Sequence, residues 1–307
     1  MKIFDNIENI DNIQPTAIAL GNFDGFHRGH VALIRRTIEV AQLNGLKSAI
    51  FTFANHPRNV IAGRSVVKHI MYPQDKLWAF EKLGLDYVFS LPFDEFFHHM
   101  DATTFIKDYV LGKFNAEEIL CGFNFHFGKG ATGNAEALAK LADSEGFELE
   151  LIEPVMVGDE LVSSTTIRRY IHDGKMEHAA TLLGRAFYIK GEVIHGNAIG
   201  RTIGFPTANI ILDQSMVQPA HGVYTARVRV DNQIYNAVTN VGVRPTIGDE
   251  HKLIESHILD FDGDLYGKEM KVELLKHLRG EMKFASLEEL AASIDADKKV
   301  AEEYFKV

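Results

Sequence analysis

Residues 16–30 read TAIALGNFDGFHRGH, an apolar run followed by a segment with a glycine at every fourth position. Apolar side chains then recur at helical spacing from Val31 to Ala41, and Gly45 ends that pattern. The segment predicts a strand, a glycine-rich turn and a helix whose N-terminus meets the turn. Because backbone N–H groups and the helix dipole favour an anion there, we expect a phosphate site. Its expected nucleotide-binding residues are Gly21, Asn22, Phe23, Asp24 and Gly25.

Two histidines, His27 and His30, stand three positions apart where the turn meets the helix. A pair of imidazoles could begin a zinc site, but no third or fourth ligand follows at a suitable spacing, and the single cysteine, Cys121, is distant in sequence. We therefore prefer phosphate contacts to metal ligation. The plainer alternative is two histidines whose hydrogen bonds are satisfied within a polar turn.

The first half of the chain alternates short apolar runs with amphipathic stretches. After the run at 16–20, further runs stand at 49–53, 87–91, 119–121 and 148–152, and one intervening helix is expected between Pro73 and Gly84. This alternation predicts a doubly wound parallel sheet that binds ligands at the carboxyl ends of its strands. We expect an α/β domain over residues 1–184.

The second half has the pattern of an antiparallel barrel or sandwich, with runs at 188–194, 223–230, 233–238, 254–259 and 270–275. A tight hairpin is expected at Asp231 and Asn232. The C-terminal segment returns to helix, with a capping box at Ser286 and Glu289. The apolar stripe expected to pack on the barrel is Leu287, Leu290, Ala291 and Ile294. We expect a β domain over residues 185–307.

Composition and charge limit the possible partners. The chain has 307 residues, 46% hydrophobic and 24% charged, which is ordinary for a globular protein of two domains. A net charge of −10 argues against broad binding to nucleic acid or anionic membranes, so any phosphate pocket must be local. With one cysteine and no apolar signal segment after Met1, we expect a cytoplasmic protein, monomeric or transiently homo-oligomeric.

The run GFPTAN at residues 204–209 is the most informative stretch of the second half. Gly204 lets the backbone pass close to a ligand and Pro206 fixes its direction. The Thr207 hydroxyl and the Asn209 carbonyl are hard oxygen ligands of the kind that Mg²⁺ prefers, so both are candidate metal ligands. Ordinary turn chemistry is the alternative.

Residues 128–133 match the dinucleotide pattern G-x-G-x-x-G. In a dinucleotide-binding fold that loop follows the first strand, whereas here the first expected strand is followed by the histidine loop, so NAD binding is not expected. Just before it, Asn124 stands among aromatic residues and could contact a base or sugar, unless the segment is simply a phenylalanine-rich core strand. Ser164, Thr165 and Arg168 could grip phosphate oxygens, although helix capping explains the hydroxyls equally well.

Glu255 and His257 share one face of an expected strand. A carboxylate near a metal-bound triphosphate could deprotonate an alcohol during phosphoryl transfer. Taken alone, an exposed strand carboxylate would be the simpler interpretation.

Taken in order, GNFDGFHRGH, FNFHFG, SSTTIR and GFPTAN closely resemble the bacterial bifunctional riboflavin kinase/FAD synthetase (FMN adenylyltransferase) family, and the resemblance spans almost the whole chain. It implies a Rossmann-like N-terminal nucleotidyltransferase that joins FMN to the AMP part of ATP and releases pyrophosphate. It also implies a C-terminal riboflavin kinase barrel that uses ATP and Mg²⁺. Riboflavin, FMN and FAD would be substrates and products.

The resemblance also implies roles for individual residues. His27 and His30 would stabilise the ATP phosphates, with Asn124 and Arg168 completing that site and Ser164 as a phosphate contact. In the barrel, Thr207 and Asn209 would hold Mg²⁺ and Glu255 would be the base. The nucleotide-covering loop would contain Gly191, Gly200, Arg201 and Gly204.

The chain departs from the family at Ala131, where many relatives have arginine, and we expect Lys129 to supply the missing charge. Two alternatives remain beside the bifunctional enzyme. One is an enzyme that retains a single activity, and the other is a flavin-sensing regulator without turnover. Product formation distinguishes the three.

Overall fold

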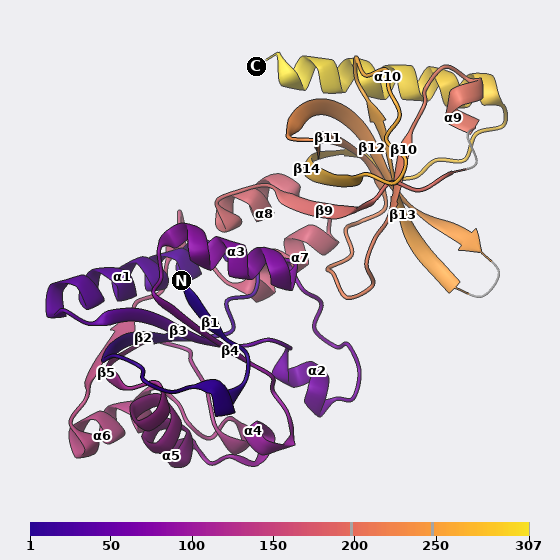
Figure 1. Cartoon of the computed structure of the whole chain (residues 1–307). Coiled ribbons are helices and arrows are strands. Elements are labelled where there is room, and N and C mark those ends of the chain that lie inside the picture. Colours follow the sequence, from indigo (N-terminus) through magenta and orange to yellow (C-terminus); the bar gives the residue numbers. More distant parts are fainter. Residues whose placement is uncertain (197–198, 247–248, 307) are drawn as a thin grey trace. The chain divides into compact units, whose positions relative to one another are not determined.

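The computed structural model describes residues 1–196, 199–246 and 249–306. The chain forms two compact units, Met1–Ser164 and Thr165–Val307 (Figure 1). The domain boundary that we expect between residues 184 and 185 separates the two family domains and is not the boundary between these compact units. It stays a prediction.

The first unit contains a six-stranded sheet in the order β1-β4-β3-β2-β5-β6, and every pair in it is parallel. Its strands are β1 (Lys2–Phe4), β2 (Thr16–Leu20), β3 (Lys47–Phe53), β4 (Tyr87–Leu91), β5 (Ala116–Gly122) and β6 (Glu148–Ile152). The predicted doubly wound parallel sheet is confirmed. β1 was not expected, because three residues carry almost no periodicity.

Helices cover both faces of this sheet (Figure 1). One face packs against α1 (Arg28–Asn44) and α3 (Pro73–Leu83) through a core that includes Phe23, Ile34 and Phe80. The other face carries Ile18, Phe51 and their neighbours. On that side lie α4 (Glu95–His99), α5 (Ala102–Thr104), the π-helix η2 (Phe105–Lys113) and α6 (Ala135–Glu145).

Alternate strand residues point to opposite faces, so each buried strand contributes to both cores. Cys121, near the end of β5, is fully buried, and burial raises the pKa of its thiol to about 12. The smaller elements of this unit are η1 (Ile7–Asn9), α2 (Pro57–Ile61), η3 (Lys129–Ala131) and the antiparallel pair β7 (Met156–Val157) and β8 (Glu160–Leu161).

The second unit is a nearly closed antiparallel barrel of six strands in the order β10-β13-β12-β11-β14-β9. The strands are β9 (Phe187–Glu192), β10 (Ala208–Ile211), β11 (Gly222–Val230), β12 (Gln233–Thr246), β13 (Asp249–Ile258) and β14 (Glu269–Arg279). A single bridge closes the ring, since the Ile194 N–H donates to the Asn209 carbonyl at 2.8 Å. The barrel alternative of the sequence prediction is confirmed, and a sandwich is not formed.

Short helices flank the barrel: α7 (Ser164–His172), α8 (Met176–Leu183) and α9 (Ile199–Thr202). α8 contacts β9 and β14. The predicted hairpin is present, because Asp231 and Asn232 join β11 to β12 with φ values of 48° and 63°.

The C-terminal helix α10 (Leu287–Phe305) begins as expected, since the Ser286 hydroxyl accepts the Glu289 N–H at 3.3 Å. Its expected apolar stripe is wrong at Leu287, which is 52% exposed. The buried positions of α10 are Asp297 and Ala301 instead. Ala301 packs with Val223 and Val238 of the barrel.

Asp297 forms a bidentate ion pair with Arg279 of β14, with N–O distances of 3.1 and 2.7 Å. Arg279 also donates to the Ser293 hydroxyl of α10 at 3.0 Å. The helix is therefore fixed to the barrel by polar contacts with Arg279 and by apolar packing around Ala301.

Candidate active sites

Aromatic packing supports the glycine-rich turn after β2. Phe23 and Phe26 adopt left-handed backbone, with φ of 53° and 46°, which non-glycine residues rarely do. The buried Phe23 ring packs edge-on against Phe80 at 5.6 Å and so stabilises this conformation. Gly25 has φ +84°, and a Cβ there would lie 3.0 Å from Ile70, so the tight turn requires glycine.

The two histidines are in contact at the N-terminus of α1. His27 is the N-cap residue, and its Nδ1 accepts the His30 N–H at 3.3 Å. Because Nδ1 accepts, a neutral His27 carries its proton on Nε2. The two rings stack with their centroids 3.5 Å apart, and His27 is buried. Two imidazoles and the N-terminus of a long helix thus meet at one place, as an anion site requires.

Asp24 and Ser164 join the turn to a distant segment. Asp24 is buried, and its Oδ1 accepts the Ile70 N–H at 3.1 Å. The Ser164 hydroxyl donates to the Asp24 carbonyl at 2.9 Å. Ser164 therefore lies at the turn, as expected, although its hydroxyl bonds to the backbone there. The side chain of Asn22 is exposed.

Lys76 of α3 was missed by the sequence interpretation. Its side chain is buried, and Nζ lies 3.3 Å from the carbonyls of Asn22 and Phe53 and from the Thr52 hydroxyl. Burial lowers the pKa of Lys76 to about 8, and the negative charge of Asp24 opposes that shift. A sequence signal existed, because Lys76 shares the apolar helix face of Ala79 and Phe80.

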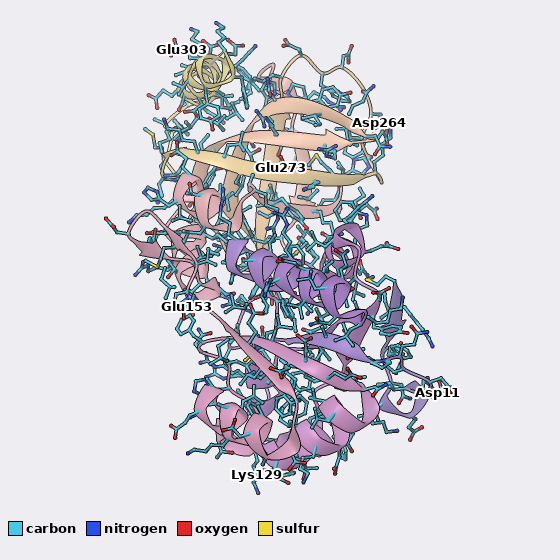
Figure 2. All side chains as sticks on the ribbon, turned by 90° about the vertical axis from the view of Figure 1, so that its left-hand side faces the viewer. Asp11, Lys129, Glu153, Asp264, Glu273 and Glu303 are labelled. Atoms are coloured by element: carbon cyan, nitrogen blue, oxygen red, sulfur yellow. The ribbon has the colours of Figure 1, made fainter. Side chains whose placement is uncertain are left out.

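Asn124 follows β5, which pairs with β2 in parallel, so its loop and the glycine-rich turn emerge at the same sheet edge. Lys129 lies elsewhere. Its N–H donates to the Met100 carbonyl at 2.7 Å, on the side of the sheet that carries α4 and α5. Figure 2 shows Lys129 at the surface of that side, away from α3. The structure therefore does not bring Lys129 to the histidine pair.

Thr165 and Arg168 belong to α7, the helix that begins at Ser164, and Ser164 contacts the turn through the Asp24 carbonyl. The G-x-G-x-x-G segment at 128–133 forms the short η3 helix after β5, and the loop after β2 carries the histidines. The expectation that this segment is not a dinucleotide loop agrees with that order.

In the barrel, three polar side chains lie in one row across adjacent strands. Glu255 of β13 is in register with Asn209 of β10 on one side and Asn240 of β12 on the other. The Asn240 amide donates to Glu255 Oε2 at 3.3 Å. His257, two residues further on, contacts the Pro206 carbonyl through Nδ1 at 3.0 Å. The row thus contains Asn209, one of the predicted metal ligands, and His257 contacts the turn that precedes Asn209.

Asn209 is only 3% exposed, and its Nδ2 donates to the Thr207 carbonyl at 3.4 Å. Within the described ranges, its Oδ1 is buried without a hydrogen-bond partner. A buried acceptor of this kind costs free energy unless another group satisfies it, and a hard cation would do so. Thr207 and Asn209 therefore fit a Mg²⁺ ion.

The predicted nucleotide-covering residues surround this turn. A Cβ on Gly200 would lie 2.2 Å from the Phe205 carbonyl oxygen, so no side chain fits there. Gly204 has φ +88°, and Arg201 is exposed on α9. Gly191 lies on β9, where a Cβ would touch Ile210 of β10 at 3.4 Å. Gly191 thus serves barrel closure, and Gly200 and Gly204 shape the turn.

An α/β unit with a candidate phosphate site and a barrel with a candidate magnesium site together indicate a two-domain, nucleotide-dependent transferase. Comparison with protein families gives the same result: a model described as FAD synthetase matches residues 9–166, and one described as riboflavin kinase matches residues 183–305. The chain belongs to the family of bifunctional riboflavin kinase/FMN adenylyltransferases.

Relatives with that family name include proteins of Bacillus subtilis and Escherichia coli K12. The first is 36% identical, over 94% of this chain and 92% of the relative. The second is 35% identical, over 99% of this chain and 98% of the relative. A solved structure from Streptococcus pneumoniae, titled a macrolide-efflux protein, is similar with a TM-score of 0.88 and 33% identity over 98% of both chains. None of the helices in the described ranges is long and apolar enough to span a bilayer.

Proposed function

We propose that this protein phosphorylates riboflavin to FMN in its second unit and adenylylates FMN to FAD in its first unit, with ATP as co-substrate of both reactions. The observation that carries this proposal is that both family models match one chain in separate segments, 9–166 and 183–305. Flavins and ATP are then its small-molecule partners.

In the first unit, an oxygen of the FMN phosphate attacks the α-phosphorus of ATP. A new P–O bond forms, the bond from that phosphorus to the β-phosphate oxygen breaks, and pyrophosphate leaves. His27, His30 and the N-terminus of α1 offset the charge that gathers on the phosphates. Positioning without a covalent intermediate carries the rate. In this proposal Asn124, Arg168 and Ser164 complete the site, and the glycine-rich turn from Gly21 to Gly25 covers the phosphates.

In the second unit, Glu255 accepts the proton of the riboflavin 5′-hydroxyl as that oxygen attacks the γ-phosphorus, and ADP leaves. Asn240 holds the Glu255 carboxylate through Oε2. Thr207 and Asn209 would hold Mg²⁺, which offsets charge on the transferred phosphoryl group when bound. The turn with Gly200, Arg201 and Gly204 covers the nucleotide.

Several expectations stay predictions beside this proposal. They are the roles of Thr165 and Lys129, a cytoplasmic location, a monomer or transient homo-oligomer, and the lack of nucleic-acid and membrane partners. The net charge of −10 supports the last of these.

The test is a time course with riboflavin, ATP and Mg²⁺, resolved by chromatography. We expect FMN to appear first and then to give way to FAD. Glu255→Gln should abolish FMN formation and leave FAD formation from supplied FMN intact. Glu273→Gln is the control, because Glu273 is also a strand carboxylate of the barrel (Figure 2), paired with Lys271 at 3.1 Å. Loss of both activities in Glu255→Gln would contradict two separate sites. In the unaltered protein, formation of FMN without FAD would support an enzyme with a single activity. The absence of any product would favour the flavin sensor.

A further inference from the structure

Lys76 is a buried cation whose bonding partners are all neutral. Its Nζ lies 3.3 Å from each of three oxygens, the Asn22 carbonyl, the Thr52 hydroxyl and the Phe53 carbonyl. The residue is 9% exposed. Burying a charge is costly, and a lysine retained in such a place usually serves a local requirement.

The three acceptors belong to two neighbouring strands. Asn22 opens the glycine-rich turn after β2, and Thr52 and Phe53 end β3. The Thr52 hydroxyl also donates to the Asn22 carbonyl at 3.1 Å. One ammonium group therefore joins the carboxyl ends of two strands at the point where the candidate ATP site begins.

The protonation state decides how strong this connection is. An ammonium group has three N–H donors and can satisfy all three oxygens at once, whereas a neutral amine has two. Hydrogen bonds from a charged donor are also the stronger ones. Only the charged lysine can hold the turn through every contact seen here.

We propose that Lys76 is a positioning residue of the adenylyl-transfer site, whose ammonium group holds the glycine-rich turn in its phosphate-binding conformation and adds a positive charge beside the bound phosphates. This inference rests on the proposed function of the first unit. Lys76 touches neither substrate, because it acts through the Asn22 carbonyl.

The surroundings fit such a role. A small pocket with a volume of about 20 Å³ adjoins Lys76. The titratable groups that line it are Asp24 from the turn, His56 from the segment after β3, and His69. Aspartate and histidine ordinarily titrate below pH 7. Of the groups that line this pocket, Lys76 is therefore the one expected to titrate between pH 7.5 and 9.5, because burial lowers its pKa to about 8. Comparison with Lys76→Met separates its effect on activity from that of lysines and tyrosines elsewhere in the chain.

The test measures FAD formation from FMN, ATP and Mg²⁺ by the full chain between pH 6.5 and 9.5, with kcat and KM determined separately. In the natural protein, kcat/KM should fall as the pH rises through about 8. Lys76→Met, a neutral side chain of similar length, should lose about tenfold in kcat/KM at pH 7, mainly through KM for ATP, and should lack the pH-dependent fall. Lys82→Met, at an exposed site of the same helix, should match the natural protein.

Riboflavin phosphorylation by the Lys76→Met chain should stay unchanged. If that variant fails to fold, the pH profile of the natural protein still decides, because a flat profile from pH 7 to 9.5 overturns the proposal. An unchanged Lys76→Met enzyme overturns it as well, while leaving the proposed function intact. If the natural protein makes no FAD at any pH, the proposed function of the unit fails and this inference fails with it.

Discussion

Raising the pH above 8 should stabilise the first unit through Lys76, even though its activity is expected to fall. The pKa of Lys76 is about 8 in the folded chain and 10.5 in its ordinary state. Between these values the unfolded chain binds a proton that the folded chain does not, so unfolding takes up a proton and becomes less favourable as the pH rises. At 1.36 kcal/mol per pH unit, the difference between the two pKa values raises the free energy of unfolding by at most ~3 kcal/mol by pH 10.5.

The assay is urea unfolding at several pH values between 7.5 and 10.5, followed through the fluorescence of Trp78. This is the single tryptophan of the chain and lies on the same helix as Lys76. Other lysines and the tyrosines titrate in this range too, so the informative quantity is the difference between the natural protein and Lys76→Met. We expect the natural protein to gain more stability with pH than the variant, and Lys82→Met to behave like the natural protein. Equal pH slopes in all three would refute the argument.

Three further results are expected. Asn209→Ala should weaken riboflavin phosphorylation and shift its Mg²⁺ dependence to higher concentration, measured by magnesium titration, while FAD formation from supplied FMN persists. Arg279→Ala should destabilise the barrel by about 3 kcal/mol in chemical denaturation, because the buried Asp297 loses its partner, whereas Lys299→Ala on the exposed face of α10 should change little. Lys129→Ala should leave KM for ATP and FMN in adenylylation unchanged, because the Lys129 backbone bonds to Met100 and not to the turn that carries the histidine pair, and a raised KM would instead support the charge that the sequence assigned to Lys129.

Local pattern predicted most of the fold. The strand, turn and helix from Thr16 to Asn44 form as expected, because apolar periodicity and the glycines at 25 and 45 specify them within one continuous segment. The antiparallel strands of the barrel follow from the same kind of signal. What local pattern could not give was β1, whose three residues become a strand only by pairing with β4.

Long-range contacts explain the remaining differences. Leu287 is exposed because α10 meets the barrel through Asp297 and Ala301, and an aspartate is not expected on a buried helix face until its partner Arg279 is known. Lys76 was missed for the same reason, since a lysine in an amphipathic helix normally points to water. Its acceptors lie more than twenty residues away along the chain.

The candidate sites were predictable to a different degree. The contact between His27 and His30 agrees with their spacing in the sequence. The pairing of Asn209 with Glu255 joins distant strands, and only the family resemblance put both residues in one site. The bond from Ser164 to Asp24 spans 140 positions and was not predicted, since the family resemblance implied only that Ser164 contacts phosphate. Side-chain chemistry of a short motif can thus be inferred locally, but its assembly from distant motifs needs the fold.

Because Cys121 is buried, the rate at which its thiol is labelled reports how often the first unit opens. The chain has one cysteine, it is buried in β5, an interior strand of the sheet, and its thiolate is scarce at neutral pH. A thiol reagent can react with it only when the sheet opens, so the labelling rate counts opening events of that unit. The barrel contributes no thiol to the signal. Ligands that bind the first unit should lower the labelling rate of Cys121 in proportion to the occupancy they reach. Ligands that bind only the barrel should leave that rate unchanged.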